Sequence, residues 1–252
     1  MTDASVAVAH FATNDFRLGS IFSRSGAVLS RHFPTFFVVT LVAYSPTVLI
    51  EILRATMPLQ GSEGLAQVVW GLLGFFLVVA ASTIGSASLM HATFQHMRRW
   101  PVRLADSLHV VSRRFFPLIG LTFLAGLVVV LGLVLLIVPG LILYTIWFVG
   151  MPACVVEGRG PWMSLRRSQE LTKGYRWKVF ALAVLLLIGD LGSSFATFEL
   201  RGYEHPIAAI GAEWIWSGLW VAFSTIVITV AYCDLRVIKE RADIDHISAV
   251  FD

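Results

Sequence analysis

Charged residues are scarce in this chain, and one long stretch has none. Asp, Glu, Lys and Arg make up 14% of the 252 residues, whereas 57% are hydrophobic. Ordinary soluble proteins carry about 25% charged residues. No charged residue lies between Phe115 and Val156. Such long uncharged runs indicate an integral membrane protein rather than a soluble one.

Cysteine is also rare, and the common catalytic motifs are missing. Cys154 and Cys233 both lie in apolar runs, which favours small buried side chains over a disulfide or a metal site. His91 and His96 are five residues apart and do not share a helix face, so interfacial polar residues are the favoured interpretation over metal ligands. No nucleophile elbow, phosphate loop, HExxH or dinucleotide fingerprint occurs. We therefore expect no catalytic residues, no metal and no cofactor, and a protein that is not an enzyme.

Six apolar segments are candidates for transmembrane helices. They cover about 33–53, 65–95, 115–138, 141–156, 177–198 and 211–233. The fourth is short, at ~24 Å for a hydrocarbon core of ~30 Å. Pro139 and Gly140 predict the turn before it, and Pro46 predicts a kink in the first segment.

A stripe of small residues marks the second apolar segment. Its members recur at helical spacing and are Ala81, Gly85, Ser88 and Ala92. Small residues let helices approach closely in lipid, where packing drives their association. Close packing is therefore favoured over the alternative, the lining of a pore.

Three basic and apolar segments, 16–32, 104–114 and 161–174, are typical of amphipathic helices that lie in the headgroup plane. Similar stretches close each of them and open the next span: LSRHFPTFF, VSRRFFPLI and LTKGYRWKVF. The fold class is thus an all-α integral membrane protein with six transmembrane helices, in-plane cytoplasmic helices and three parallel hairpin repeats. Chance similarity of boundaries where basic residues precede aromatic ones is the alternative to a repeat.

The expected organisation has one membrane domain and two flanking segments. Residues 1–15 form a flexible N-terminus, 16–238 the six-span domain and 239–252 a cytoplasmic tail with a short docked helix. All lysines and arginines except Arg54 and Arg201 then fall on one side of the membrane. Basic residues favour the cytoplasmic side, so both termini are expected there.

Asp190 is the outstanding candidate for an intramembrane polar site. A carboxylate inside a span costs a few kcal/mol unless it is paired, protonated or hydrated. Glu51 and Glu213 lie near the same outer level, so a carboxylate cluster is one hypothesis. The alternatives for Asp190 are a structural hydrogen bond to Ser193, Ser194 or another span, and a water-exposed outer end.

Basic residues gather in the segments expected on the cytoplasmic side. Candidate contacts to anionic lipid are Arg98, Arg99, Arg113, Arg114, Arg166, Arg167, Lys173 and Arg176. Each basic residue near the surface contributes ~1 kcal/mol of attraction to anionic headgroups. We expect membrane phospholipids of the cytoplasmic leaflet as partners, and another membrane protein as a further partner. The membrane accounts for this charge, so nucleic acid is not expected.

Four segments resemble a known bacterial family. They are 137–140 (IVPG), 157–158 (EG), 164–177 (SLRRSQELTKGYRW) and 232–236 (YCDLR). The resemblance is to the multi-pass membrane domain associated with glycerophosphoryl diester phosphodiesterases. It implies a membrane fold in the bacterial inner membrane. It does not carry over catalysis, which in the family's full-length enzymes resides in a separate soluble barrel that these residues do not contain.

Three of the matching residues also predict a structural clamp at the cytoplasmic helix ends. Glu170 is spaced to pair with Arg166, Arg167 or Lys173 on one helical turn. Asp234 is expected to pair with an arginine of a neighbouring unit, and Arg236 completes the candidate set.

The sequence predicts a non-catalytic integral membrane protein that serves as a scaffold, a lipid-interacting module or a partner-binding module. The basic residues of the segments expected on the cytoplasmic side and the missing catalytic motifs favour this interpretation. The alternative is a small transporter or channel that uses Asp190 inside the membrane.

Overall fold

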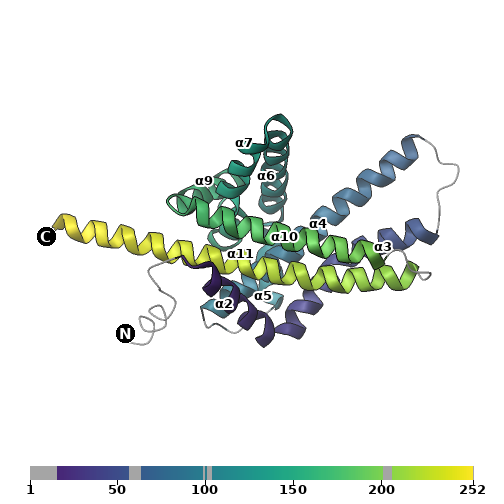
Figure 1. Ribbon diagram of the computed structural model, residues 1–252, viewed down its shortest axis with the longest axis horizontal. Helices are drawn as coiled ribbons and strands as arrows, with labels where there is room; N and C mark the ends of the chain where they lie inside the picture. The colour runs from purple at the N-terminus through teal and green to yellow at the C-terminus, as the bar shows by residue number, and fades with distance from the viewer. Residues whose placement is uncertain (1–15, 57–63, 99, 101–103, 201–205, 252) are drawn as a thin grey trace.

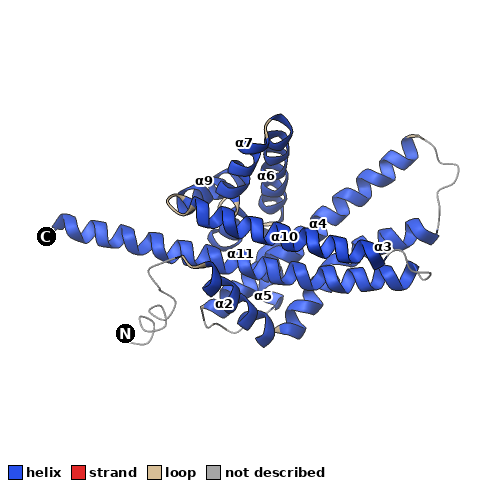
Figure 2. Cartoon of the chain, viewed as in Figure 1, coloured by secondary structure: helices blue, strands red, loops and turns tan. Residues whose placement is uncertain are grey.

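The protein is built from helices long enough to cross a membrane several times. The structure, a computed structural model, describes residues 16–56, 64–98, 100, 104–200 and 206–251. Within these ranges there is no strand (Figure 2). Six segments in them have the length and apolar composition of membrane spans: Phe33–Ile50, Val68–Met97, Phe115–Leu135, Ile137–Glu157, Arg176–Phe195 and Ile210–Glu240. The chain is therefore a multi-pass membrane protein, as its composition predicts.

Short amphipathic helices alternate with pairs of apolar spans along the chain, and one of these spans consists of two helices. Helix α2 (Leu18–Arg31) precedes α3 (Phe33–Thr56) and α4 (Leu65–Met97). Helix α5 (Leu104–Arg113) precedes α6 (Phe115–Leu135), α7 (Ile137–Trp147) and α8 (Gly150–Glu157). Helix α9 (Pro161–Thr172) precedes α10 (Arg176–Leu200) and α11 (Pro206–Phe251). The three predicted amphipathic helices are confirmed as helices, each ahead of an apolar hairpin.

Helix α11 forms the centre of the main core. It packs against α2, α3, α4 and α10, and Figure 1 shows it running beside α10 and extending beyond the other helices toward the C-terminus. Ile226 and Val230 of α11 are fully buried with Ile21 of α2, Leu89 of α4 and Leu182 of α10. The first amphipathic helix thus buries its apolar face against the ends of the spans.

The predicted boundary between the last span and a separate tail helix is wrong. Helix α11 continues without a break from Pro206 to Phe251. After Cys233 the sequence contains no glycine and no proline, and its Leu, Arg, Lys, Glu and Ala residues favour a helix. The helix therefore has no local reason to end where the apolar run ends.

The chain reverses between α6 and α7 at Leu136, three residues before the predicted Pro139-Gly140 turn. Leu136 has an extended backbone (φ −155°, ψ 122°), and α7 begins at Ile137. Pro139 lies in the first turn of α7, where its missing N–H costs no hydrogen bond. Gly140 has a different role, because a Cβ there would lie 2.5 Å from the backbone nitrogen of Leu133. Gly140 lets α6 and α7 approach closely.

The fourth span is broken into α7 and α8, which the sequence analysis did not predict. The break lies at Phe148 and Val149, and α8 begins at Gly150. Pro152 explains it, since the ring of a proline clashes with the carbonyl four residues earlier, here that of Phe148.

The small-residue stripe of α4 serves packing. Gly85, Ser88 and Ala92 are buried, and a Cβ at Gly85 would overlap the Cβ of Ala43 in α3. This is the close helix approach predicted for the stripe. The first half of α4 and the tip of the α6–α7 hairpin expose large apolar side chains, including Trp70, Phe76 and Val134, which suits lipid contact.

Candidate functional site

A buried carboxylate, Glu157, joins three helices where α8 ends. Its side chain is 9% exposed. Oε1 accepts hydrogen bonds from Nε of Arg167 in α9 and from the hydroxyl of Tyr232 in α11, both at 3.0 Å. Oε2 lies 3.0 Å from Nε of Arg159. One carboxylate therefore faces two guanidinium groups and a phenol.

Arginine and glutamate side chains extend this network along α11. Arg167 also lies 3.4 Å from Oε1 of Glu240, through its Nη2 atom. Nε of Arg236 donates to the same oxygen at 2.7 Å. Arg236, one of the predicted clamp residues, thus reaches α9 through Glu240 and not directly.

A second ion pair fastens α2 to α11. Arg24 donates to Asp234 through both terminal nitrogens, Nη1 to Oδ1 at 2.8 Å and Nη2 to Oδ2. Such bidentate pairs are the strongest and most directional that arginine makes with carboxylates. Asp234 therefore pairs with an arginine of the first helix–hairpin unit, as the sequence predicts.

Arg114, at the junction between α5 and α6, caps the end of α8. Its Nη1 atom donates to the carbonyl of Val155, and a cation at a helix C-terminus is favoured by the helix dipole. Gly158 follows in the left-handed conformation (φ 69°), and a Cβ on it would lie 2.6 Å from Nη2 of Arg114. Only glycine fits both constraints at this position.

Histidines occupy two other junctions between amphipathic helices and spans. Nε2 of His32 lies 2.9 Å from Nδ1 of His96, and Nδ1 of His91 lies 3.0 Å from Oγ of Ser107. These contacts join α4 to the α2–α3 junction and to α5. In the part of the chain that the structure describes, no three His, Cys, Asp or Glu side chains are grouped to hold a metal ion.

The sequence-based prediction assigned the structural clamp to Glu170 and missed the role of Glu157. Glu170 is 54% exposed and lies 3.5 Å from Arg166 and 4.0 Å from Arg167, both in its own helix. Glu157 entered only through the family resemblance. Its signal was available, because it is the first charged residue after the uncharged run and is followed by a glycine.

The structure divides the predicted lipid-contacting cations into two groups. Arg114 and Arg167 are engaged inside the protein, and Arg166 pairs with Glu170. The exposed cations without an ion pair in the described residues are Arg98, Arg113, Lys173 and Arg176. Arg99 lies outside the described residues.

The three candidate intramembrane carboxylates differ in their surroundings. Asp190 is exposed on α10, within electrostatic range of the hydroxyl groups of Tyr44 in α3 and Tyr144 in α7. Glu213 is half-buried on α11. The side chain of Glu51 lies outside the described part of the chain.

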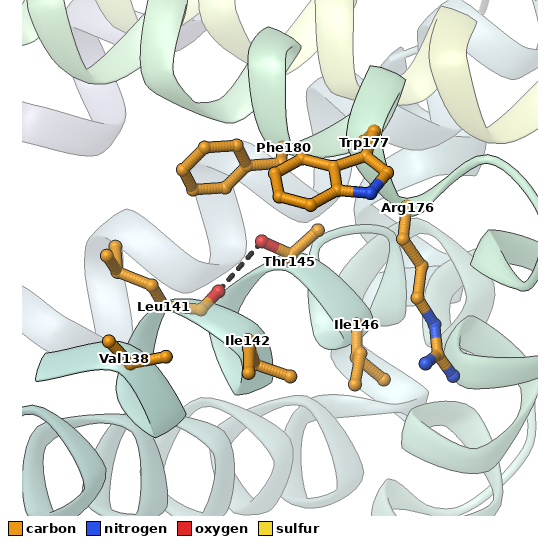
Figure 3. Close-up of a pocket in the computed structure, with 8 residues that line it drawn as sticks. All are labelled: Val138, Leu141, Ile142, Thr145, Ile146, Arg176, Trp177 and Phe180. Carbon is orange, nitrogen blue, oxygen red and sulfur yellow. Dashed lines mark hydrogen bonds between the residues drawn. The ribbon is translucent and has the colours of Figure 1, made fainter. Parts of the chain in front are cut away.

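An apolar groove separates α7 from the start of α10. Its volume is about 380 Å³. Figure 3 shows Trp177 and Phe180 of α10 on one side and the side chains of α7 on the other. The groove is lined by Val138, Leu141, Ile142, Thr145, Ile146, Arg176, Trp177 and Phe180.

Comparison with known proteins leaves the family open. No family model, no curated protein and no solved structure matches the chain. The resemblance to the phosphodiesterase-associated membrane domain therefore stays a prediction that rests on its four short segments. The contacts and exposed cations of the structure are therefore the basis for the functional proposal.

Proposed function

We propose that this chain is a non-catalytic, lipid-interacting scaffold of the bacterial cytoplasmic membrane, with both termini in the cytoplasm. The observation that carries the proposal is the division of the cations. Arg167 pairs with Glu157 and Glu240, and Arg24 pairs with Asp234. Arg113 and Arg176, by contrast, remain exposed with no carboxylate partner in the described residues. Cations left free beside apolar spans attract anionic headgroups.

The positions of the polar contacts support the same proposal. The ion pairs, the histidine contacts and the cap on α8 join the amphipathic helices to the ends of the spans, so their side chains are occupied in holding helices together. Amphipathic helices held against the ends of spans in this way are suited to lie in the headgroup layer, where their unpaired cations contact lipid. A second membrane protein is a further partner that the same basic face would accept.

Anionic lipid is expected to stabilise the purified protein more than zwitterionic lipid does. Thermal unfolding of the full chain in detergent is measured after addition of phosphatidylglycerol or of phosphatidylcholine with the same acyl chains. With phosphatidylglycerol we expect a Tm higher by several degrees, because a ligand that binds only the folded state stabilises it. The difference should shrink at high salt, since exposed charges are screened.

Phosphatidylcholine serves as the control, because it supplies the same hydrocarbon and a phosphate within a headgroup that has no net charge. Equal Tm values with the two lipids, at low and high salt, would contradict the proposal. A protein that copurifies in fixed proportion and stabilises the chain in the absence of lipid would replace it with a purely protein-binding scaffold.

A transporter is the second candidate, and one observation favours it. The fourth span is interrupted between α7 and α8, and transporters commonly build their binding sites from interrupted helices. Asp190, within electrostatic range of Tyr144 of the broken span, would be the site carboxylate.

If this second candidate holds, Asp190→Asn should abolish a flux that the wild-type protein supports. Proton uptake into proteoliposomes is followed with a pH-sensitive dye after a potassium diffusion potential is applied. Glu170→Gln is the matched control, since it removes an exposed carboxylate at the helix ends. Wild-type flux equal to that of empty liposomes, or undiminished in Asp190→Asn, rejects proton transport through Asp190.

A further inference from the structure

We propose that the groove between α7 and α10 binds one anionic phospholipid, with an acyl chain along the groove and the phosphate on Arg176. This site rests on the proposed lipid-interacting function and gives it a location. Four observations carry it: the apolar walls, the free cation at one end, the exposed tryptophan beside that cation and the size of the groove.

The walls of the groove suit a hydrocarbon chain. All lining residues except Thr145 and Arg176 are apolar. The hydroxyl of Thr145 donates to the carbonyl of Leu141 at 2.7 Å (Figure 3), so it has no hydrogen left to offer a ligand. The volume of about 380 Å³ falls within the range of ~300–1,000 Å³ that is usual for small-molecule sites.

Arg176 supplies the charge at one end of the groove. It is the first residue of α10, its side chain is exposed, and no carboxylate pairs with it in the described ranges. Figure 3 shows this side chain extending past Ile146, across the end of the groove. Guanidinium groups bind phosphate oxygens with two parallel hydrogen bonds, so the headgroup of a phospholipid is the complementary partner.

Trp177 places the groove at the right depth for a lipid. The residue is 84% exposed, and exposed tryptophans favour the boundary between headgroups and hydrocarbon. From that level the α7 wall runs from Ile146 to Val138, which is ~12 Å of helix. A lipid whose phosphate lies at Arg176 therefore has room to place a chain against α7.

Neighbouring charges favour an anionic headgroup over a zwitterionic one. Lys173 and Lys178 flank Arg176 and are both exposed. The nearest carboxylate along the sequence, Glu170, lies on α9 against Arg166. A positive choline group would be repelled here, whereas a headgroup with net negative charge gains from each cation.

Native mass spectrometry of the full chain tests the site. The purified protein is titrated with phosphatidylglycerol or phosphatidylcholine of matched chains, and binding of the first lipid is measured. Arg176→Gln should weaken binding of the first phosphatidylglycerol molecule by roughly fivefold. Arg31→Gln, which removes an exposed arginine at the junction between α2 and α3, should leave that first binding step unchanged.

A second pair of variants tests the groove itself. Ile142→Trp fills the groove and should remove the first binding step for both lipids. Leu131→Trp on α6 is its control, because Ile142 and Leu131 are each 50% exposed but only Ile142 lines the groove. Thermal unfolding without added lipid shows whether each variant is folded.

The outcomes separate the site from the function. If the wild type prefers phosphatidylglycerol but neither Arg176→Gln nor Ile142→Trp changes the first step in folded protein, the site is wrong and the lipid-interacting function stands. If Arg31→Gln weakens the first step as much as Arg176→Gln, a diffuse charged surface replaces the site. If the wild type shows no preference between the lipids, both proposals fail.

Discussion

Replacing Glu157 with alanine is expected to lower the free energy of unfolding by about 3 kcal/mol. The carboxylate is 9% exposed and is the shared acceptor for Arg167 and Tyr232. Its removal leaves the guanidinium of Arg167, itself 19% exposed, with only the longer contacts to Glu240 and Glu170. An incompletely paired charge in this position is the source of the loss.

The effect should appear as a fall in Tm of roughly 6–12 °C in detergent, by the usual relation for chains of this length. Glu170→Ala is the control, because the side chain of Glu170 is 54% exposed and such a surface ion pair contributes ~1 kcal/mol or less. A double-mutant cycle of Glu157→Ala with Arg167→Ala isolates the pair energy. Equal effects of Glu157→Ala and Glu170→Ala would refute a stabilising network centred on Glu157.

Gly140→Ala is expected to cost about 2–3 kcal/mol, because the new methyl group meets the backbone of Leu133 as well as its side chain, and the backbone cannot move aside. Its Cβ would lie 2.5 Å from the nitrogen of Leu133, where α6 and α7 cross. The hairpin would have to open, and the wall of the groove formed by α7 would move with it.

Gly126→Ala on α6 is the matched control. A Cβ at Gly126 has no neighbour within 4 Å, so the substitution should be neutral or stabilise the helix by up to ~1 kcal/mol. Thermal unfolding of both variants in detergent gives the comparison. A Gly140→Ala protein as stable as Gly126→Ala would contradict the close approach of the two helices at Gly140.

The sequence alone determined the membrane class, the approximate spans and the amphipathic helices. These properties are local, because in lipid every backbone polar group must be satisfied within its own helix, and hydropathy therefore reports a span directly. The same reasoning predicted α2, α5 and α9 from basic and apolar residues at helical spacing. It also predicted that the small residues around Gly85 pack closely, since a stripe of small residues lets helices approach one another in lipid.

Only the tertiary structure decided which polar residues meet. The sequence favoured Glu170 by its spacing, but the buried acceptor is Glu157, whose partners Arg167 and Tyr232 are 10 and 75 positions away. The turn at Leu136 rather than Gly140 follows from the contact between α6 and α7, which no local pattern encodes. Whether a cation has a carboxylate partner, as Arg167 does, or has none among the described residues, as Arg176, depends on side chains brought together by folding. Such pairings depend on where helices that are distant in the sequence cross in the folded protein.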